Sequence, residues 1–164
     1  MSSRILILLF LLLPLFYLRA DPLLRLHDGE KWTAIDRAKW EKLPRTKVNA
    51  TSRSEEKTVF EGVPIGEILK LLHAPTGDQR RAEKMKLMVL MTARDGYQTA
   101  FSLAELDDSF RKRGIILADS ASGKSLSDFE GPLMIVVPDE ERHSRWIRQV
   151  SQIALITVRN SPPP

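Results

Sequence analysis

The sequence predicts an α+β domain in which a mixed, curved β-sheet or partial barrel is accompanied by short helices. Three observations support this fold class: strand-length apolar runs outnumber amphipathic helical stretches, turn signals recur between them, and no internal repeat is present. The roughly 140 residues after the first twenty are enough to bury one hydrophobic core. We therefore expect one domain over residues 21–160, followed by a proline tail at residues 161–164.

Residues 1–20 are predicted to be a signal peptide rather than part of the domain. Arg4 precedes an uncharged apolar run from Ile5 to Leu18 that is interrupted only by Pro14. This run is shorter than the roughly 20 residues that a membrane-spanning helix needs. An uncleaved N-terminal anchor is the alternative, and it would be the only membrane contact. In either case we expect a periplasmic or secreted protein, and the leader and small domain are typical of bacteria.

The first half of the domain alternates strands, turns and short helices. Asp28-Gly29 predicts a tight turn after the first strand, and Asp36 can cap a short helix that ends before Pro44. A second helix is expected from Ile65 to Leu72, because its apolar residues recur on one helical face. The strands expected in this half are Leu23–His27 and Thr46–Thr51.

The second half is dominated by apolar runs that are short enough to be buried strands. Asp95-Gly96 predicts another tight turn, and Ser102 with Glu105 forms a capping box for a helix that runs to about Phe110. The strands expected in this half are Leu87–Met91, Tyr97–Phe101, Gly114–Ala118, Leu133–Val137 and Ile153–Val158.

Composition and charge argue against a nucleic-acid partner. The formal charge is +4, but removing Arg4 and Arg19 of the leader leaves 23 basic residues against 21 acidic ones. Basic and acidic residues are interleaved, whereas a nucleic-acid-binding surface gathers positive charge on one face. We expect a small molecule or an exported protein as the partner.

The sequence around several familiar motifs does not support the function that each motif usually indicates. Ala118–Ser125 fits a loose phosphate-loop pattern, but no helix follows it, so a hairpin turn is expected there. His27, His73 and His143 lack metal-ligand partners at a regular spacing. The three tryptophans are expected to pack into the core, and the alternative is that one of them lines a binding cleft.

Four stretches spread from Trp32 to Val158 together resemble the oxidoreductase molybdopterin-binding domain family, which has the sulfite-oxidase fold. Phe60–Ile65 with Ile68-Leu69 resembles the family's W-x-G-V-P-L element, and Asp95–Tyr97 with Ser102-Leu103 resembles its D-G-Y element. The remaining two stretches are Gly123–Leu126 and Gly131–Pro138. The resemblance implies a sulfite-oxidase-like fold, and we expect Gly62 and Gly96 to occupy sharp turns.

The sequence departs from this family at the residues that carry the chemistry. A single cysteine thiolate holds molybdenum in the family, and this chain contains no cysteine. The family's cysteine would fall within Asn49–Ser52, and Met134 replaces an expected arginine. We expect no catalytic residues and no metal ligands. The candidate cofactor-binding residues are Asn49, Thr51, Ser52, Arg53, Arg145 and Arg148. The first three lie where the family's cysteine would fall, and the arginines are included because their planar fork suits phosphate.

Three functions from different classes remain open. The first is an exported molybdopterin-oxidoreductase-like domain that has lost molybdenum ligation, carries no cofactor and acts as a binding or accessory module. The second is a molybdopterin-dependent oxidoreductase that holds its cofactor without a protein thiolate, through an oxygen ligand such as Thr51 or Ser52. The third is a pterin- or anion-binding protein without redox chemistry. The sequence favours the first of these.

Overall fold

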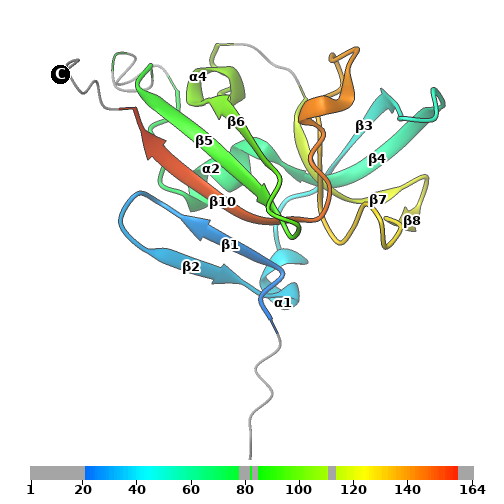
Figure 1. Ribbon diagram of the computed structural model, residues 1–164, viewed down its shortest axis with the longest axis horizontal. Helices are drawn as coiled ribbons and strands as arrows, with labels where there is room; N and C mark the ends of the chain where they lie inside the picture. Colours follow the sequence, from blue (N-terminus) through cyan, green and yellow to red (C-terminus); the bar gives the residue numbers. More distant parts are fainter. Residues whose placement is uncertain (1–20, 78–81, 83–84, 111–113, 159–164) are drawn as a thin grey trace, which may run out of the picture.

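The computed structural model describes residues 21–77, 82, 85–110 and 114–158, and its strands form two sheets (Figure 1). The first, which we call the mixed sheet, has the strand order β2-β1-β10-β5-β6. Strand β1 runs parallel to β10, and the other neighbours are antiparallel. The first strand of the domain therefore lies beside the last. The strands are β1 (Leu24–His27), β2 (Trp32–Ile35), β5 (Leu87–Ala93), β6 (Gln98–Ser102) and β10 (Val150–Thr157).

The second sheet, the antiparallel sheet, has the order β3-β4-β7-β8, and β9 also pairs with β7. Every pairing in it is antiparallel. Its strands are β3 (Thr46–Thr51), β4 (Lys57–Pro64), β7 (Ile116–Ala121), β8 (Lys124–Ser125) and β9 (Met134–Val136).

Two backbone hydrogen bonds connect the sheets where β9 meets the segment that leads into β10. Ile135 N donates to Ile147 O at 3.0 Å, and Val150 N donates to Leu133 O at 2.9 Å. The α+β class and the predominance of strands are thus confirmed. The sequence predicted one mixed, curved sheet or a partial barrel; the strands form two connected sheets, one of them mixed, which do not close into a barrel in the part of the chain that the structure describes.

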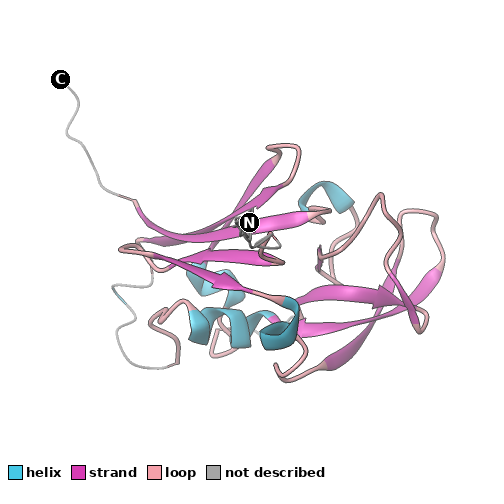
Figure 2. Ribbon diagram, turned by 90° about the horizontal axis from the view of Figure 1, so that it is seen from below, coloured by secondary structure: helices cyan, strands magenta, loops and turns pink. Residues whose placement is uncertain are grey.

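The helices are short, as Figure 2 shows. The helices whose bounds lie within the described residues are α1 (Arg37–Trp40), α2 (Ile65–Leu71) and α4 (Leu103–Leu106), with a 3₁₀ helix at His143–Arg145. The two predicted N-caps are confirmed: Asp36 accepts a hydrogen bond from Lys39 N at 2.8 Å, and Ser102 Oγ accepts one from Glu105 N at 3.2 Å. This is the serine half of the predicted capping box; the Glu105 carboxylate pairs with Arg145 at 2.8 Å. The helices predicted to reach Leu43 and Phe110 end earlier than expected. Among the described residues, no helix has the length and apolar character needed to span a membrane.

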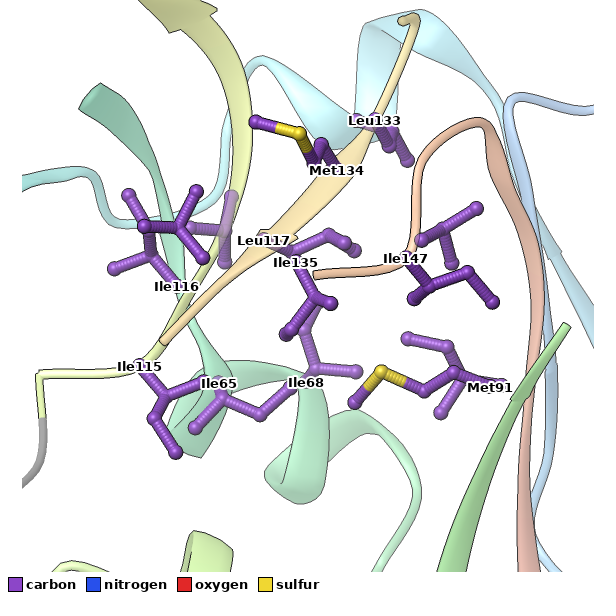
Figure 3. Packing of buried hydrophobic residues seen from close by; sticks show 14 of the residues in the cluster. Ile65, Ile68, Met91, Ile115, Ile116, Leu117, Leu133, Met134, Ile135 and Ile147 are labelled. Carbon is purple, nitrogen blue, oxygen red and sulfur yellow. The ribbon is translucent and has the colours of Figure 1, made fainter. Parts of the chain in front are cut away.

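One apolar cluster includes side chains from both sheets and from α2 (Figure 3). Ile68 of α2 and Met91 of β5 are completely buried in it, and so is Ile135 of β9. Trp40 and Trp146 are also buried, as predicted, whereas Trp32 lies on the sheet surface and is 46% exposed. This cluster holds the two sheets together along the seam where β9 meets the segment before β10. It therefore also fixes the loops that emerge from this seam.

The two glycines expected in sharp turns behave differently. Gly96 has φ 87° in the turn between β5 and β6, as expected. Gly62 lies inside β4, so the expectation of a turn there was wrong. A Cβ at this position would lie 2.5 Å from Ala118 Cα, which means that β4 and β7 approach too closely for any side chain.

The phosphate-loop pattern forms the hairpin that the sequence predicted. Ser122 and Gly123, with φ of 50° and 76°, connect β7 to β8. The predicted leader at residues 1–20 and proline tail at residues 161–164 lie outside the described residues.

Candidate functional site

A cleft of about 520 Å³ lies where two hairpin turns meet the segment between β9 and β10. We call it the arginine cleft. Its size falls within the range of small-molecule sites, roughly 300–1,000 Å³. The side chains that give it its chemical character are Arg53, Asp95, Tyr97, Phe129, Trp146 and Arg148.

Arg53 reaches the cleft from the tip of the β3–β4 hairpin. Its Nη2 donates to the carbonyl oxygens of His143, at 2.9 Å, and Trp146, at 3.2 Å. In return, His143 Nε2 lies 2.8 Å from Thr51 O, within hydrogen-bonding distance. These contacts fix the hairpin against the 3₁₀ helix. No carboxylate of the described residues pairs with Arg53, so its positive charge has no acidic partner there.

Arg148 enters the cleft from the segment that leads into β10. Its guanidinium carbon lies 3.6 Å from the centre of the Phe129 ring, a cation–π contact. Phe129 is nevertheless 67% exposed. Gln149 holds the loop that carries this ring, because its Nε2 donates to Asp128 O at 2.8 Å and its backbone N donates to Glu130 O at 2.9 Å.

The turn between β5 and β6 forms the opposite wall. Asp95 Oδ1 accepts a hydrogen bond from Tyr97 N at 2.9 Å, which stabilises the turn. The Tyr97 hydroxyl donates to Ser144 O at 3.0 Å, so the exposed ring is held in place against the 3₁₀ helix. This wall therefore offers an aromatic surface and a carboxylate.

Trp146 forms the floor of the cleft and is only 1% exposed. Its Nε1 donates to Val137 O at 3.1 Å, and its ring meets the rings of Phe60 and His143 edge-on. Trp146 is thus both a core residue and a cleft residue, which combines the two interpretations that the sequence left open.

The structure brings together some of the predicted site residues. Arg53 and Arg148 line the same cleft. Thr51 and Ser52 lie beside Arg53 in an adjoining hollow of about 430 Å³, which His143 also lines. Asn49 is exposed on β3 and lines neither hollow.

Arg145 also lines neither hollow and is engaged elsewhere. Its guanidinium pairs with Glu105, at 2.8 Å, and with Glu140, and it lies 4.6 Å from the centre of the Phe101 ring. The hydrogen bond that Arg145 donates to Glu105 is the main reason that the pKa of Arg145 is raised. This arginine is therefore neutralised by acidic neighbours, unlike Arg53 and Arg148.

The residues at the expected metal position do not suit molybdenum. Ala50 is buried against the core, while Asn49 and Thr51 on either side of it are exposed. Oxygen and amide groups are the only donors in this stretch, whereas the family's metal is held by a soft thiolate. The described residues also contain no group of three or more histidine, aspartate or glutamate side chains arranged to hold a metal ion.

A second hollow, of about 1070 Å³, which we call the Asp119 groove, was not anticipated from the sequence. Asp119 accepts hydrogen bonds from Trp40 Nε1, at 2.6 Å, and from both terminal nitrogens of Arg45. Burial alone would raise the pKa of Asp119, but the hydrogen bonds from Arg45 and Trp40 lower it below its usual value. The charges of Asp119 and Arg45 in this groove are thus already paired with each other.

The sequence did not single out Asp95, Tyr97 and Phe129 as binding residues. Asp95 and Tyr97 were recognised as part of a turn, of the strand that follows it and of the D-G-Y element, without a binding role. Phe129 stands alone among polar residues in Ser127–Glu130, and an isolated aromatic residue in a polar loop is the signal that could have drawn attention to it.

No protein-family model matches the sequence, and no curated protein matches it. The resemblance to the molybdopterin-binding family therefore rests on the sequence motifs alone.

Proposed function

We propose that this chain is an exported binding module that holds an organic anion in the arginine cleft and performs no redox chemistry. In this proposal the domain is of molybdopterin-oxidoreductase type and has lost molybdenum ligation. The observation that carries the proposal is the meeting of Arg53 and Arg148 in one cleft, although they are far apart in the sequence. Neither has a carboxylate partner among the described side chains.

The contrast with Arg45 and Arg145 supports a binding role. Arg45 pairs with Glu61 and Asp119, and Arg145 pairs with two glutamates. Arg53 contacts backbone carbonyls and Arg148 contacts an aromatic ring. Because a guanidinium presents a planar fork of donors, an unpaired one retains the capacity to bind a carboxylate or phosphate.

The aromatic walls indicate that the anion carries an apolar part. Tyr97 and Phe129 expose large ring surfaces, and Trp146 lies beneath them. Aromatic residues together with arginine are the side chains that contribute most to recognition surfaces. An inorganic ion would leave these rings uncovered, whereas an organic anion covers them.

Retention of a pterin is the second candidate, and the position of Thr51 and Ser52 beside Arg53 favours it. A pterin with a phosphate group is both planar and anionic, so it shares the chemistry of the first candidate. An oxidoreductase would further require that an oxygen of Thr51 or Ser52 replace the thiolate.

Calorimetric titration with 3-phenylpropionate tests the proposal. We expect saturable binding to the exported protein, weakened about tenfold by Arg53→Met or Arg148→Met, since a hydrogen bond to a charged group contributes roughly 1.5–3 kcal/mol. Arg94→Met is the control, because Arg94 is exposed outside the cleft. Absence of binding, or equal weakening by the control, would overturn the proposal.

Elemental and pterin analysis separates the candidates. Protein exported from a host that makes molybdenum cofactor is expected to contain neither metal nor pterin. Pterin without metal would favour the second candidate. Stoichiometric molybdenum would contradict both binding proposals and would direct mutagenesis to Asn49–Arg53.

A further inference from the structure

We infer, on the basis of the proposed function, that the ligand of the arginine cleft is a zwitterion: an α-amino acid with a large apolar or aromatic side chain. The cleft contains charges of both signs, because Asp95 lines it together with Arg53 and Arg148. Each class of group on such a ligand has a counterpart in the cleft.

Asp95 supplies the counterpart for an ammonium group. Its Oδ1 accepts the hydrogen bond from Tyr97 N, and no cationic side chain of the described chain forms an ion pair with it. A carboxylate without a cation repels a simple anion that enters beside it, whereas it attracts an ammonium group. A ligand with both charges therefore suits the cleft better than an anion alone.

Arg53 and Arg148 supply the counterpart for the α-carboxylate. They reach the cleft from the β3–β4 hairpin and from the segment before β10, while Asp95 reaches it from the β5–β6 turn. The opposite charges thus come from separate elements that converge on one hollow. Convergence on one hollow suits an α-amino acid, because its ammonium and carboxylate groups are attached to the same carbon atom.

The apolar walls supply the counterpart for the side chain. The Tyr97 ring is held by its bond to Ser144 O, and the loop of Phe129 is held by two bonds from Gln149. Surfaces that are already fixed lose little conformational freedom when a ligand binds. A volume of about 520 Å³ accommodates a single amino acid with bridging waters.

Three probes of similar size isolate the contribution of each charge: L-phenylalanine has both charges, 3-phenylpropionate lacks the ammonium, and 2-phenylethylamine lacks the carboxylate. We expect phenylalanine to bind about tenfold more tightly than 3-phenylpropionate in calorimetric titrations. 2-Phenylethylamine is expected to be the weakest, because it brings a third positive charge beside the two arginines.

The variant Asp95→Asn tests the role assigned to this carboxylate. Asparagine retains an oxygen that accepts the Tyr97 amide, so the turn is preserved while the charge is removed. We expect phenylalanine binding to fall about tenfold, to the level of 3-phenylpropionate, without loss of 3-phenylpropionate affinity. Asp28→Asn is the matched control, since Asp28 stabilises a similar turn between β1 and β2, outside the cleft.

The outcomes separate this inference from the proposed function. Equal binding of phenylalanine and 3-phenylpropionate, unchanged in Asp95→Asn, would overturn the zwitterion and leave the anion-binding module intact. Failure of every probe to bind would contradict both. The melting temperatures of Asp95→Asn and Asp28→Asn should also be measured. If both lie within a few degrees of the native protein, a loss of affinity reflects the lost charge and not unfolding.

Discussion

Arg45 and Asp119 form a two-point ion pair that joins the chain ahead of β3 to β7. Arg45 Nη2 lies 2.6 Å from Asp119 Oδ1, and Nη1 lies 3.0 Å from Oδ2. Trp40 Nε1 donates to the same carboxylate. Because the Asp119 side chain is only 15% exposed, the three donors compensate for the water that it has lost.

Asp119→Asn is expected to destabilise the protein at neutral pH by about 1–3 kcal/mol, because the ion pair is lost while Arg45 stays partly buried. The effect depends on pH. The pKa of Asp119 is lowered on folding, so the unfolded chain takes up the proton first as the pH falls. The stabilisation is therefore complete above about pH 4 and is lost as the pH falls through the lower, folded-state pKa. Urea denaturation at pH 7 and at pH 3 measures this. A difference between the two proteins that is the same at both pH values would contradict the role of the charge.

Gly62→Ala is expected to destabilise the protein by about 1–3 kcal/mol or more, because the new Cβ would overlap the backbone of Leu117 and Ala118. Gly66→Ala is the matched control. Gly66 lies within α2 with nothing within 4 Å of its Cβ position, so alanine there should stabilise the helix by about 0.5–1 kcal/mol. Chemical denaturation of both variants measures the two effects. Similar values for the two would show that β4 and β7 are not in such close contact.

Arg145→Met is expected to lower stability but to leave ligand affinity unchanged. The substitution leaves Glu105 and Glu140 without this guanidinium, and it removes the contact with Phe101. Arg148→Met, three residues later, should have the opposite profile: little change in stability and about tenfold weaker binding of 3-phenylpropionate. Denaturation midpoints and titrations on both variants check this contrast. A loss of affinity in Arg145→Met would place the anion elsewhere.

Trp146→Phe is expected to cost about 2 kcal/mol, because it leaves a gap beneath the cleft and removes the hydrogen-bond donor to Val137 O. Trp32→Phe is the control. Trp32 is nearly half exposed, so the same substitution there should change stability by less than about 0.5 kcal/mol. Thermal or urea unfolding gives the comparison. Equal costs would indicate that the floor of the cleft is not packed as described.

The sequence predicted features that depend on neighbouring residues. Asp36 and Ser102 cap helices because a short polar side chain reaches an amide three residues ahead. Gly96 occupies a turn for an equally local reason. The close approach at Gly62 could not be foreseen, because it depends on a strand that comes much later in the chain.

The site was predictable only in part, because it too depends on contacts between residues far apart in the sequence. The sequence identified Arg53, Arg145 and Arg148 by residue type, which cannot distinguish a paired arginine from an unpaired one. Arg145, at the end of the 3₁₀ helix, pairs with two glutamates and does not line the cleft. The meeting of Arg53 with Arg148 requires the seam between the two sheets, which long-range packing determines.

Amide NMR spectra recorded during titration of the protein with 3-phenylpropionate show directly whether an organic anion binds between Arg53 and Arg148. We expect saturable shifts confined to residues around the arginine cleft: Arg53, the Asp95–Tyr97 turn, Phe129 and the segment from His143 to Gln149. Shifts centred on Arg45 and Asp119 in the other groove, or no saturable shifts at all, would contradict it.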